Sequence, residues 1–179
     1  RTTGPLPPAR AIHLLRQVCG ALAEAHQVGL VHRDIKPGNV IVATLGGQTD
    51  VAKLLDFGLV QDVSADTDGR LTRTGMILGT PAYMSPEQAA GESTVDARGD
   101  VYSLGAMAFF ILAGRPPFEG KTVGQLLDAH RGEPPPPLID VRPDVPTDLA
   151  AVVARCLAKN PADRYPSAVE LAQTLGQST

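Results

Sequence analysis

The segment His32-Arg33-Asp34-Ile35-Lys36-Pro37-Gly38-Asn39 combines three kinds of functional side chain in one short stretch. Asp34 supplies a carboxylate, Lys36 an amine and Asn39 a carboxamide, all within six residues. Phosphoryl transfer needs a carboxylate to orient the acceptor hydroxyl, a cation for the phosphate oxygens and an oxygen ligand for Mg²⁺. The segment therefore points to phosphoryl-transfer chemistry.

This segment lies between a predicted helix and a predicted β-hairpin. Before it, apolar residues recur every three to four positions, which predicts a helix over about 8–28. After it, the short apolar runs 40–42 and 51–55, separated by a glycine-containing turn, predict two short strands. Asp56-Phe57-Gly58 follows the second strand and places another carboxylate at a strand end, where it could bridge a hard cation to phosphates.

The remainder of the chain has mostly helical patterns. Residues 61–79 are polar and aperiodic, which is typical of a long functional loop. Pro134-Pro135-Pro136-Pro137 fits either a connector between two helices or a polyproline recognition motif. Further helices are predicted over 100–113, about 122–131, 147–158 and 166–175. The predicted fold class is α+β, mainly α-helical, with one small β-hairpin.

In residues 32–39, called the catalytic segment below, and in Asp56-Phe57-Gly58 the chain resembles the eukaryotic-like Ser/Thr protein kinases of bacteria. The resemblance continues through Gly79-Thr80-Pro81-Ala82-Tyr83-Met84-Ser85-Pro86-Glu87, which is similar to the loop that closes a kinase activation segment. It also includes Asp100-Val101-Tyr102-Ser103-Leu104-Gly105, which is similar to the start of the family's central helix. The resemblance implies a kinase C-terminal lobe over residues 1–179, with the activation segment at about 56–87.

The resemblance assigns roles in catalysis. Asp34 would be the catalytic base, and Lys36 would contact the γ-phosphate of ATP. Asn39 and Asp56 would hold Mg²⁺, and Ile41 would form the floor of the adenine pocket. The implied activity is transfer of the ATP γ-phosphate to Ser or Thr hydroxyls of protein substrates, with ATP and Mg²⁺ as cofactors.

The same resemblance implies regulation by phosphorylation. Arg33, beside the base, would pair with a phosphate on the loop, because a guanidinium binds a phosphate bidentately. Thr72 and Thr74 match the autophosphorylated threonines of such kinases.

Four other residues receive supporting roles. Thr80 would hydrogen-bond toward the catalytic base and its neighbouring lysine, an arrangement that indicates Ser or Thr as the acceptor. Glu87 and Arg164 would form a partly buried ion pair. Asp100, at the head of an apolar helix, would anchor the catalytic loop.

Each motif also has a less specific interpretation. His32 is predicted to be a buried packing residue whose ring hydrogen-bonds to backbone, not a general base or metal ligand. Asp34, Lys36, Asn39 and Asp56 could form a polar network without turnover, as in a pseudokinase-like docking module. A small-molecule phosphotransferase of related fold is a third interpretation, but a lysine two residues after the base argues against it.

The composition of the 179 residues, with 43% hydrophobic and 20% charged, is typical of one globular domain. A formal net charge of −3, without a run of Lys or Arg, argues against nucleic acid as a partner. Cys19 and Cys156 are far apart in sequence and are predicted to be buried thiols in a reducing compartment. With no apolar stretch long enough to span a membrane, this indicates a cytoplasmic location for the chain, although the full-length protein could be tethered to a membrane outside this segment.

Two parts of the kinase pattern are not found in the sequence. No two of the 18 glycines stand two residues apart, so no G-x-G-x-x-G loop can cover the phosphates. The four lysines are Lys36, Lys53, Lys121 and Lys159, and none precedes the catalytic segment. We therefore expect a C-terminal lobe cut from a longer chain, without its N-terminal lobe and inactive on its own.

Overall fold

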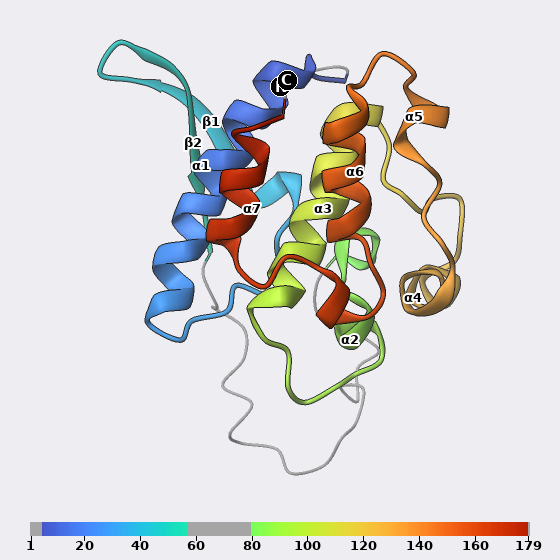
Figure 1. Ribbon diagram of the computed structural model, residues 1–179. Helices are drawn as coiled ribbons and strands as arrows, with labels where there is room; N and C mark the ends of the chain where they lie inside the picture. Colours follow the sequence, from blue (N-terminus) through green and yellow to red (C-terminus); the bar gives the residue numbers. More distant parts are fainter. Residues whose placement is uncertain (1–4, 57–79, 179) are drawn as a thin grey trace.

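The computed structural model describes residues 5–56 and 80–178, in which helices predominate (Figure 1). The helices are α1 (Pro8–Gln27), α2 (Pro86–Ala89), α3 (Ala97–Ala113), α4 (Val123–Gly132), α5 (Leu138–Val141), α6 (Thr147–Cys156) and α7 (Ala168–Leu175). Strands β1 (Val40–Leu45) and β2 (Gln48–Leu54) form an antiparallel hairpin. The connections include the 3₁₀-helices η1 (Pro37–Asn39), η3 (Pro81–Tyr83) and η4 (Pro161–Asp163). The prediction of a mainly helical fold with one hairpin is confirmed.

Helix α3 is the central element of the core. Most of its residues are buried, among them Tyr102, Leu104 and Phe109. Helices α1 and α6 pack against it and run antiparallel to it, and α7 runs antiparallel to α1 (Figure 1). The approach of α6 is close, since a Cβ added at Gly105 would lie 2.5 Å from the Cβ of Cys156. Glycine at this position therefore permits the tight packing of α3 on α6.

Helix α3 begins at Ala97, three residues before the predicted start at Asp100. The side chain of Asp96 caps the helix by accepting a hydrogen bond of 2.8 Å from the backbone N–H of Arg98. The apolar run begins only at Val101, so hydrophobic periodicity gave no sign of the first turn. As a result Asp100 lies inside the helix, not at its head, and its side chain is fully buried.

The β-hairpin is longer than predicted and is attached to α1. The strands meet at a two-residue turn, Gly46-Gly47, with φ of 57° and 81°, a region that favours glycine. The side chain of Gln17 donates to the backbone oxygen of Asp50 at 2.8 Å and accepts from the N–H of Ala52 at 3.0 Å. These bonds fix β2, which leads to the predicted metal-binding segment, against the first helix.

Helix α4 is fixed to the core by Lys159, a residue that sequence reasoning did not single out. Its amine donates to the backbone oxygens of Ala129 and His130 at 3.0 and 2.9 Å and lies 4.7 Å from the centre of the Phe118 ring. Burial lowers the pKa of Lys159 to about 8. The segment 133–137 then connects α4 to α5, a four-residue helix too short to give a periodic pattern.

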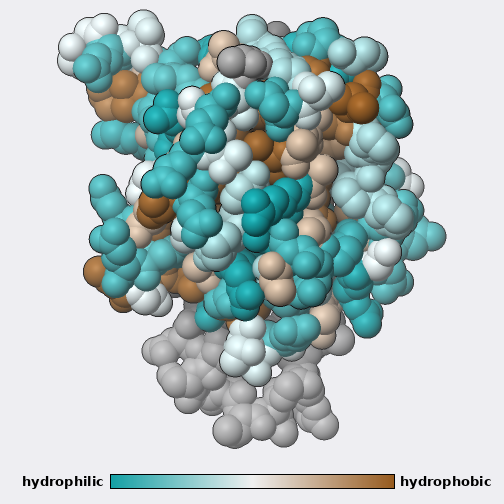
Figure 2. Space-filling model, viewed as in Figure 1, coloured by the Kyte–Doolittle hydropathy of each residue, from teal (hydrophilic) through white to brown (hydrophobic). Residues whose placement is uncertain are grey.

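The surface is predominantly hydrophilic on the face seen in Figure 2. Cys19 and Cys156 are buried free thiols, as predicted, and burial raises the pKa of Cys19 to about 12. None of the helices in residues 5–56 and 80–178 combines the length and hydrophobicity that a membrane-spanning segment needs.

Candidate active site

The catalytic segment is held by the buried carboxylate of Asp100. Its oxygens accept hydrogen bonds from the backbone N–H groups of His32 at 2.8 Å and Arg33 at 2.7 Å. Arg33 has a φ of 67°, which is unfavourable for a residue with a side chain and is stabilised here by this bond. The structure thus places Asp100 where an anchor of the catalytic segment was predicted.

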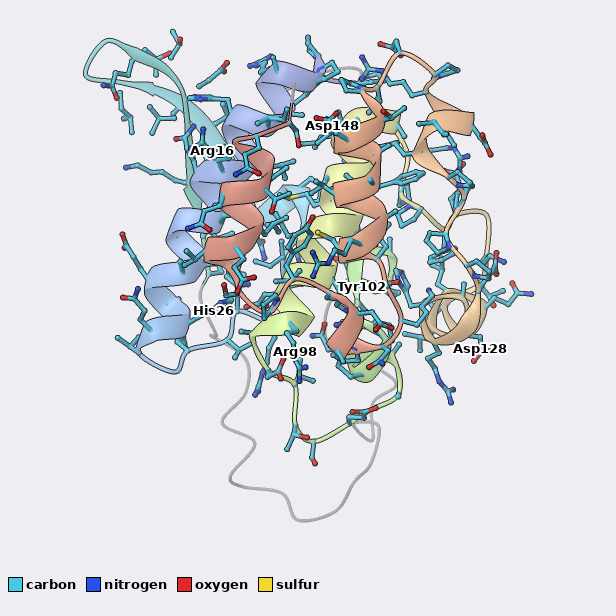
Figure 3. All side chains as sticks on the ribbon, in the orientation of Figure 1. Arg16, His26, Arg98, Tyr102, Asp128 and Asp148 are labelled. Carbon is cyan, nitrogen blue, oxygen red and sulfur yellow. The ribbon has the colours of Figure 1, made fainter. Side chains whose placement is uncertain are left out.

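A third group contacts the same carboxylate. The ring Nε2 of His26 lies 2.8 Å from Asp100 Oδ2, and the His26 side chain is only 12% exposed. Figure 3 shows His26 at the C-terminal end of α1. Sequence reasoning missed His26, because the two residues lie 74 positions apart and no local motif connects them.

The ring of His32 connects the catalytic segment to the end of the hairpin. The N–H of Asp34 donates to His32 Nδ1 at 3.2 Å, so the ring proton lies on Nε2, which donates to the backbone oxygen of Leu55 at 2.8 Å. His32 is 2% exposed. The interpretation of His32 as a buried residue that hydrogen-bonds to backbone is therefore confirmed.

The three groups that suggested phosphoryl transfer lie together. Lys36 Nζ donates to Asp34 Oδ2 at 2.6 Å, and Asn39 Nδ2 donates to the same oxygen at 3.0 Å and to the Asp34 backbone oxygen at 2.8 Å. Asn39 is buried in η1, whereas the Asp34 and Lys36 side chains are 38% and 25% exposed. The carboxylate is thus oriented from two sides and still reaches solvent, where a substrate could meet it.

Ile41 and Asp56 belong to the two sides of the β-hairpin: Ile41 lies on β1, and Asp56 follows the end of β2. The N–H of Leu55 donates to the backbone oxygen of Asn39 at 2.8 Å, so Asp56 follows directly after a residue bonded to the catalytic segment. Asp56 is exposed and has a φ of 57°. Ile41, two residues after Asn39 on β1, is 48% exposed, which leaves an apolar surface next to the catalytic segment.

Thr80 is placed by the structure, but the candidate phosphorylation sites are not. Thr80 precedes η3, and no hydrogen bond joins it to Asp34 or Lys36 in the part of the chain that is described. That role of Thr80 stays a prediction. Thr72 and Thr74 lie outside the described residues.

Glu87 and Arg164 form the predicted ion pair, and it is more deeply buried than expected. Two parallel hydrogen bonds of 2.8 and 2.9 Å join the guanidinium to the carboxylate, and the two side chains are 0% and 7% exposed. Burial alone would raise the pKa of Glu87, but the hydrogen bonds and positive charge of Arg164, together with hydrogen bonds from the backbone and Ser85, hold this pKa below its ordinary value. Gln88, next in sequence, donates to the Arg33 backbone oxygen at 2.7 Å and so connects α2 to the catalytic segment.

Two side chains near the catalytic segment, Asn39 and Asp56, offer oxygen ligands for a hard cation such as Mg²⁺. Asn39 uses its amide nitrogen on Asp34, and none of the hydrogen bonds between described residues uses its Oδ1. Within residues 5–56 and 80–178, no three His, Cys, Asp or Glu side chains cluster as a complete metal site. Mg²⁺ commonly takes one or two protein ligands and completes its shell with water and substrate phosphates, so Asn39 and Asp56 fit it chemically.

Comparison with known proteins agrees with the family resemblance seen in the sequence. A family model described as "Protein kinase domain" matches residues 1–175. The chain is 44% identical over 170 residues to the serine/threonine-protein kinase PknB of Mycolicibacterium smegmatis, covering 95% of this chain and 26% of that protein. It is also 44% identical over 163 residues to Pkn1 of Myxococcus xanthus, another serine/threonine-protein kinase, covering 91% of this chain and 23% of that protein. The chain thus spans about a quarter of the length of these curated relatives.

A solved structure also resembles the chain over nearly its whole length. The crystal structure of the Mycobacterium tuberculosis PknI kinase domain superposes with a TM-score of 0.72 at 33% identity. The match covers 99% of this chain and 58% of that chain.

Proposed function

This chain belongs to the protein kinase family, and we propose that it is the catalytic-loop and substrate-binding lobe of a Ser/Thr protein kinase. The enzyme would transfer the γ-phosphate of ATP to Ser or Thr hydroxyls of proteins. One observation carries the proposal: Asp34 is oriented by Lys36 and Asn39 on a backbone fixed to buried Asp100. A phosphoryl-transfer site requires this combination of base, cation and amide.

In the proposed reaction, Asp34 acts on the acceptor. Its exposed carboxylate would accept a hydrogen bond from the substrate hydroxyl and orient the hydroxyl oxygen toward the γ-phosphorus. It would take the proton as the bond from this oxygen to phosphorus forms and the bond from phosphorus to the bridging oxygen breaks, with ADP as the leaving group. Lys36 would stabilise the charge on the transferred phosphoryl group. General-base assistance is worth about 10²–10⁴-fold, so substitution of Asp34 should reduce kcat by that amount.

The proposed metal site consists of Asn39 and Asp56. When bound, Mg²⁺ would neutralise charge on the phosphate oxygens of ATP. Asn39 is suited to this role because its amide nitrogen is engaged by Asp34, which directs its oxygen away from the segment's own backbone. Ile41 would provide the apolar surface for adenine.

We further propose that residues 1–179 constitute a C-terminal lobe and need an N-terminal lobe for activity. The family pattern includes a glycine-rich loop and a strand lysine that contact the ATP phosphates, and the sequence before His32 contains neither. ATP affinity and phosphate transfer by the isolated 179 residues should therefore be very low. Arg33 would then serve regulation by pairing with phosphate on Thr72 or Thr74 in the activation segment, about 56–87.

The experiment compares the 179-residue chain with the protein extended by its upstream coding sequence. We expect the extended protein to phosphorylate a generic basic protein on Ser or Thr, and its Asp34→Asn variant to lose this activity, while the short chain has none. If the extended protein binds ATP but transfers no phosphate, a pseudokinase-like docking module is the correct function. Transfer by the short chain that depends on Asp34 would contradict the two-lobe proposal.

A further inference from the structure

Both ends of the connection between α4 and α5 have backbone angles in the polyproline II region. Glu133 has φ −78° and ψ 128°, and Pro137 has φ −58° and ψ 129°. The residues from Pro134 to Pro136 have φ fixed by their own rings. Polyproline II geometry lies near φ −75° and ψ +145°, so both ends of the segment fall in this region.

The four prolines present two different faces. A polyproline II helix has three residues per turn, so Pro134 and Pro137 share one face. These two prolines are exposed, whereas Pro135 and Pro136 are half-buried. Ile139, just beyond, is 43% exposed and extends the apolar surface. In Figure 1 the segment lies at the right-hand edge of the molecule, between α4 and α5.

The backbone of the segment also has unused acceptors. Among the described residues, no hydrogen bond uses the carbonyl oxygens of Pro134, Pro135 or Pro136, while that of Pro137 accepts from the N–H of Asp140. Prolines cannot donate, so this stretch offers acceptors only. Domains that bind polyproline II ligands insert two prolines between aromatic side chains of a groove.

Charged side chains lie on the α4 side of this apolar face. Glu133 pairs with Lys121 at 2.9 Å, and Arg131 pairs weakly with Asp128 at 3.5 Å, with the Arg131 side chain 55% exposed. Asp128 points away from the body of the molecule (Figure 3). An apolar centre with a charged rim is the usual composition of a protein-binding patch.

We propose that the segment 133–139 is a docking motif for a partner domain with an aromatic groove that recognises polyproline II helices. Pro134 and Pro137 are the anchors, and the carbonyl oxygens between them accept hydrogen bonds from the rim of the groove. The rigid backbone lowers the entropic cost of binding, because the segment already has the bound conformation. This proposal does not depend on the catalytic activity.

The test uses three purified probes, an SH3, a WW and an EVH1 domain, titrated with the 179-residue chain while the fluorescence of the groove tryptophan is followed. We expect at least one probe to bind. Pro134→Ala/Pro137→Ala, which removes both anchors, should raise Kd by at least about tenfold, which corresponds to a loss of about 1.4 kcal/mol. The matched control, Pro135→Ala/Pro136→Ala, should stay within about threefold. Circular dichroism verifies the fold, and Pro134→Ala alone serves if the double variant unfolds.

Three results would overturn the proposal. The first is that no probe binds the chain. The second is that both double variants weaken binding equally, and the third is that Pro134→Ala/Pro137→Ala binds as tightly as wild type. Sedimentation checks the other possible occupant, a second copy of the chain. Self-association that is lost in Pro134→Ala would show that the face is covered by this protein itself.

Discussion

Removal of one partner of the buried ion pair between Glu87 and Arg164 should cost far more stability than removal of one partner of an exposed ion pair elsewhere in residues 5–56 and 80–178. Replacement of Glu87 by Met leaves the fully buried Arg164 guanidinium without its carboxylate, which should cost about 3–5 kcal/mol in free energy of unfolding. Replacement of Arg164 by Met should cost more. The guanidinium also donates to the backbone oxygens of Ala158, Lys159 and Arg98, and each unpaired buried carbonyl costs about 1–3 kcal/mol.

The assay is a double-mutant cycle from urea unfolding of the 179-residue chain, followed by circular dichroism. The double variant Glu87→Met/Arg164→Met should be destabilised by clearly less than the sum of the single variants, because it leaves no unpaired charge. Arg115→Met/Glu119→Met is the control, since this pair is 37% and 50% exposed at 3.5 Å and should be worth less than about 1 kcal/mol. If Arg164→Met does not fold, Arg164→Lys replaces it, and its free energy of unfolding should lie between those of wild type and Glu87→Met.

Two results would refute this reasoning. One is additivity of the single variants within about 0.5 kcal/mol, which would mean that the two side chains act independently. The other is an equal loss for Glu87→Met and Arg164→Met, which would show that the three carbonyl bonds of Arg164 contribute nothing.

Three further predictions follow from the structure. The pKa of Glu87 is lowered in the folded state, so its contribution to stability is present above the ordinary Glu pKa of about 4.3 and is lost as pH falls through the folded value. The difference in free energy of unfolding between wild type and Glu87→Met should therefore shrink steadily as pH falls below about 4.3. Gly105→Ala should destabilise the chain by about 1–3 kcal/mol, because its Cβ would lie 2.5 Å from that of Cys156, whereas Gly124→Ala, with nothing within 4 Å, should be neutral or stabilising in the same urea assay. His26→Phe should reduce kcat of the extended protein roughly tenfold without a matching change in KM for the peptide, because the anchor of the catalytic segment loses one hydrogen bond to a charged group; an unchanged kcat would exclude this role.

The sequence predicted local structure well and long-range polar contacts poorly. Helix α1 was predicted from periodicity, α3 from its continuous apolar run and α4, α6 and α7 from helical patterns. Asp34, Lys36 and Asn39 were predicted to act together because they are neighbours in the chain. His26 and Lys159 were missed, since each acts on groups 29 or more residues away. Helix α5 and the first turn of α3 were missed because neither has enough apolar residues to show a period.

The first turn of α3, which periodicity did not reveal, joins the catalytic segment to Glu87, the last residue of the proposed activation segment. Asp100 there holds the backbone of Arg33, and the Arg98 backbone oxygen accepts from Arg164, which also binds Glu87. All of these contacts are buried at least in part, so a substitution among them removes packing and site geometry together. Asp34 and Lys36 differ, because both reach solvent and make few contacts that the fold depends on. Substitutions of Asp100, Arg164 or Glu87 should therefore reduce stability and activity in parallel. Substitutions of Asp34 or Lys36 should reduce activity and leave stability nearly unchanged.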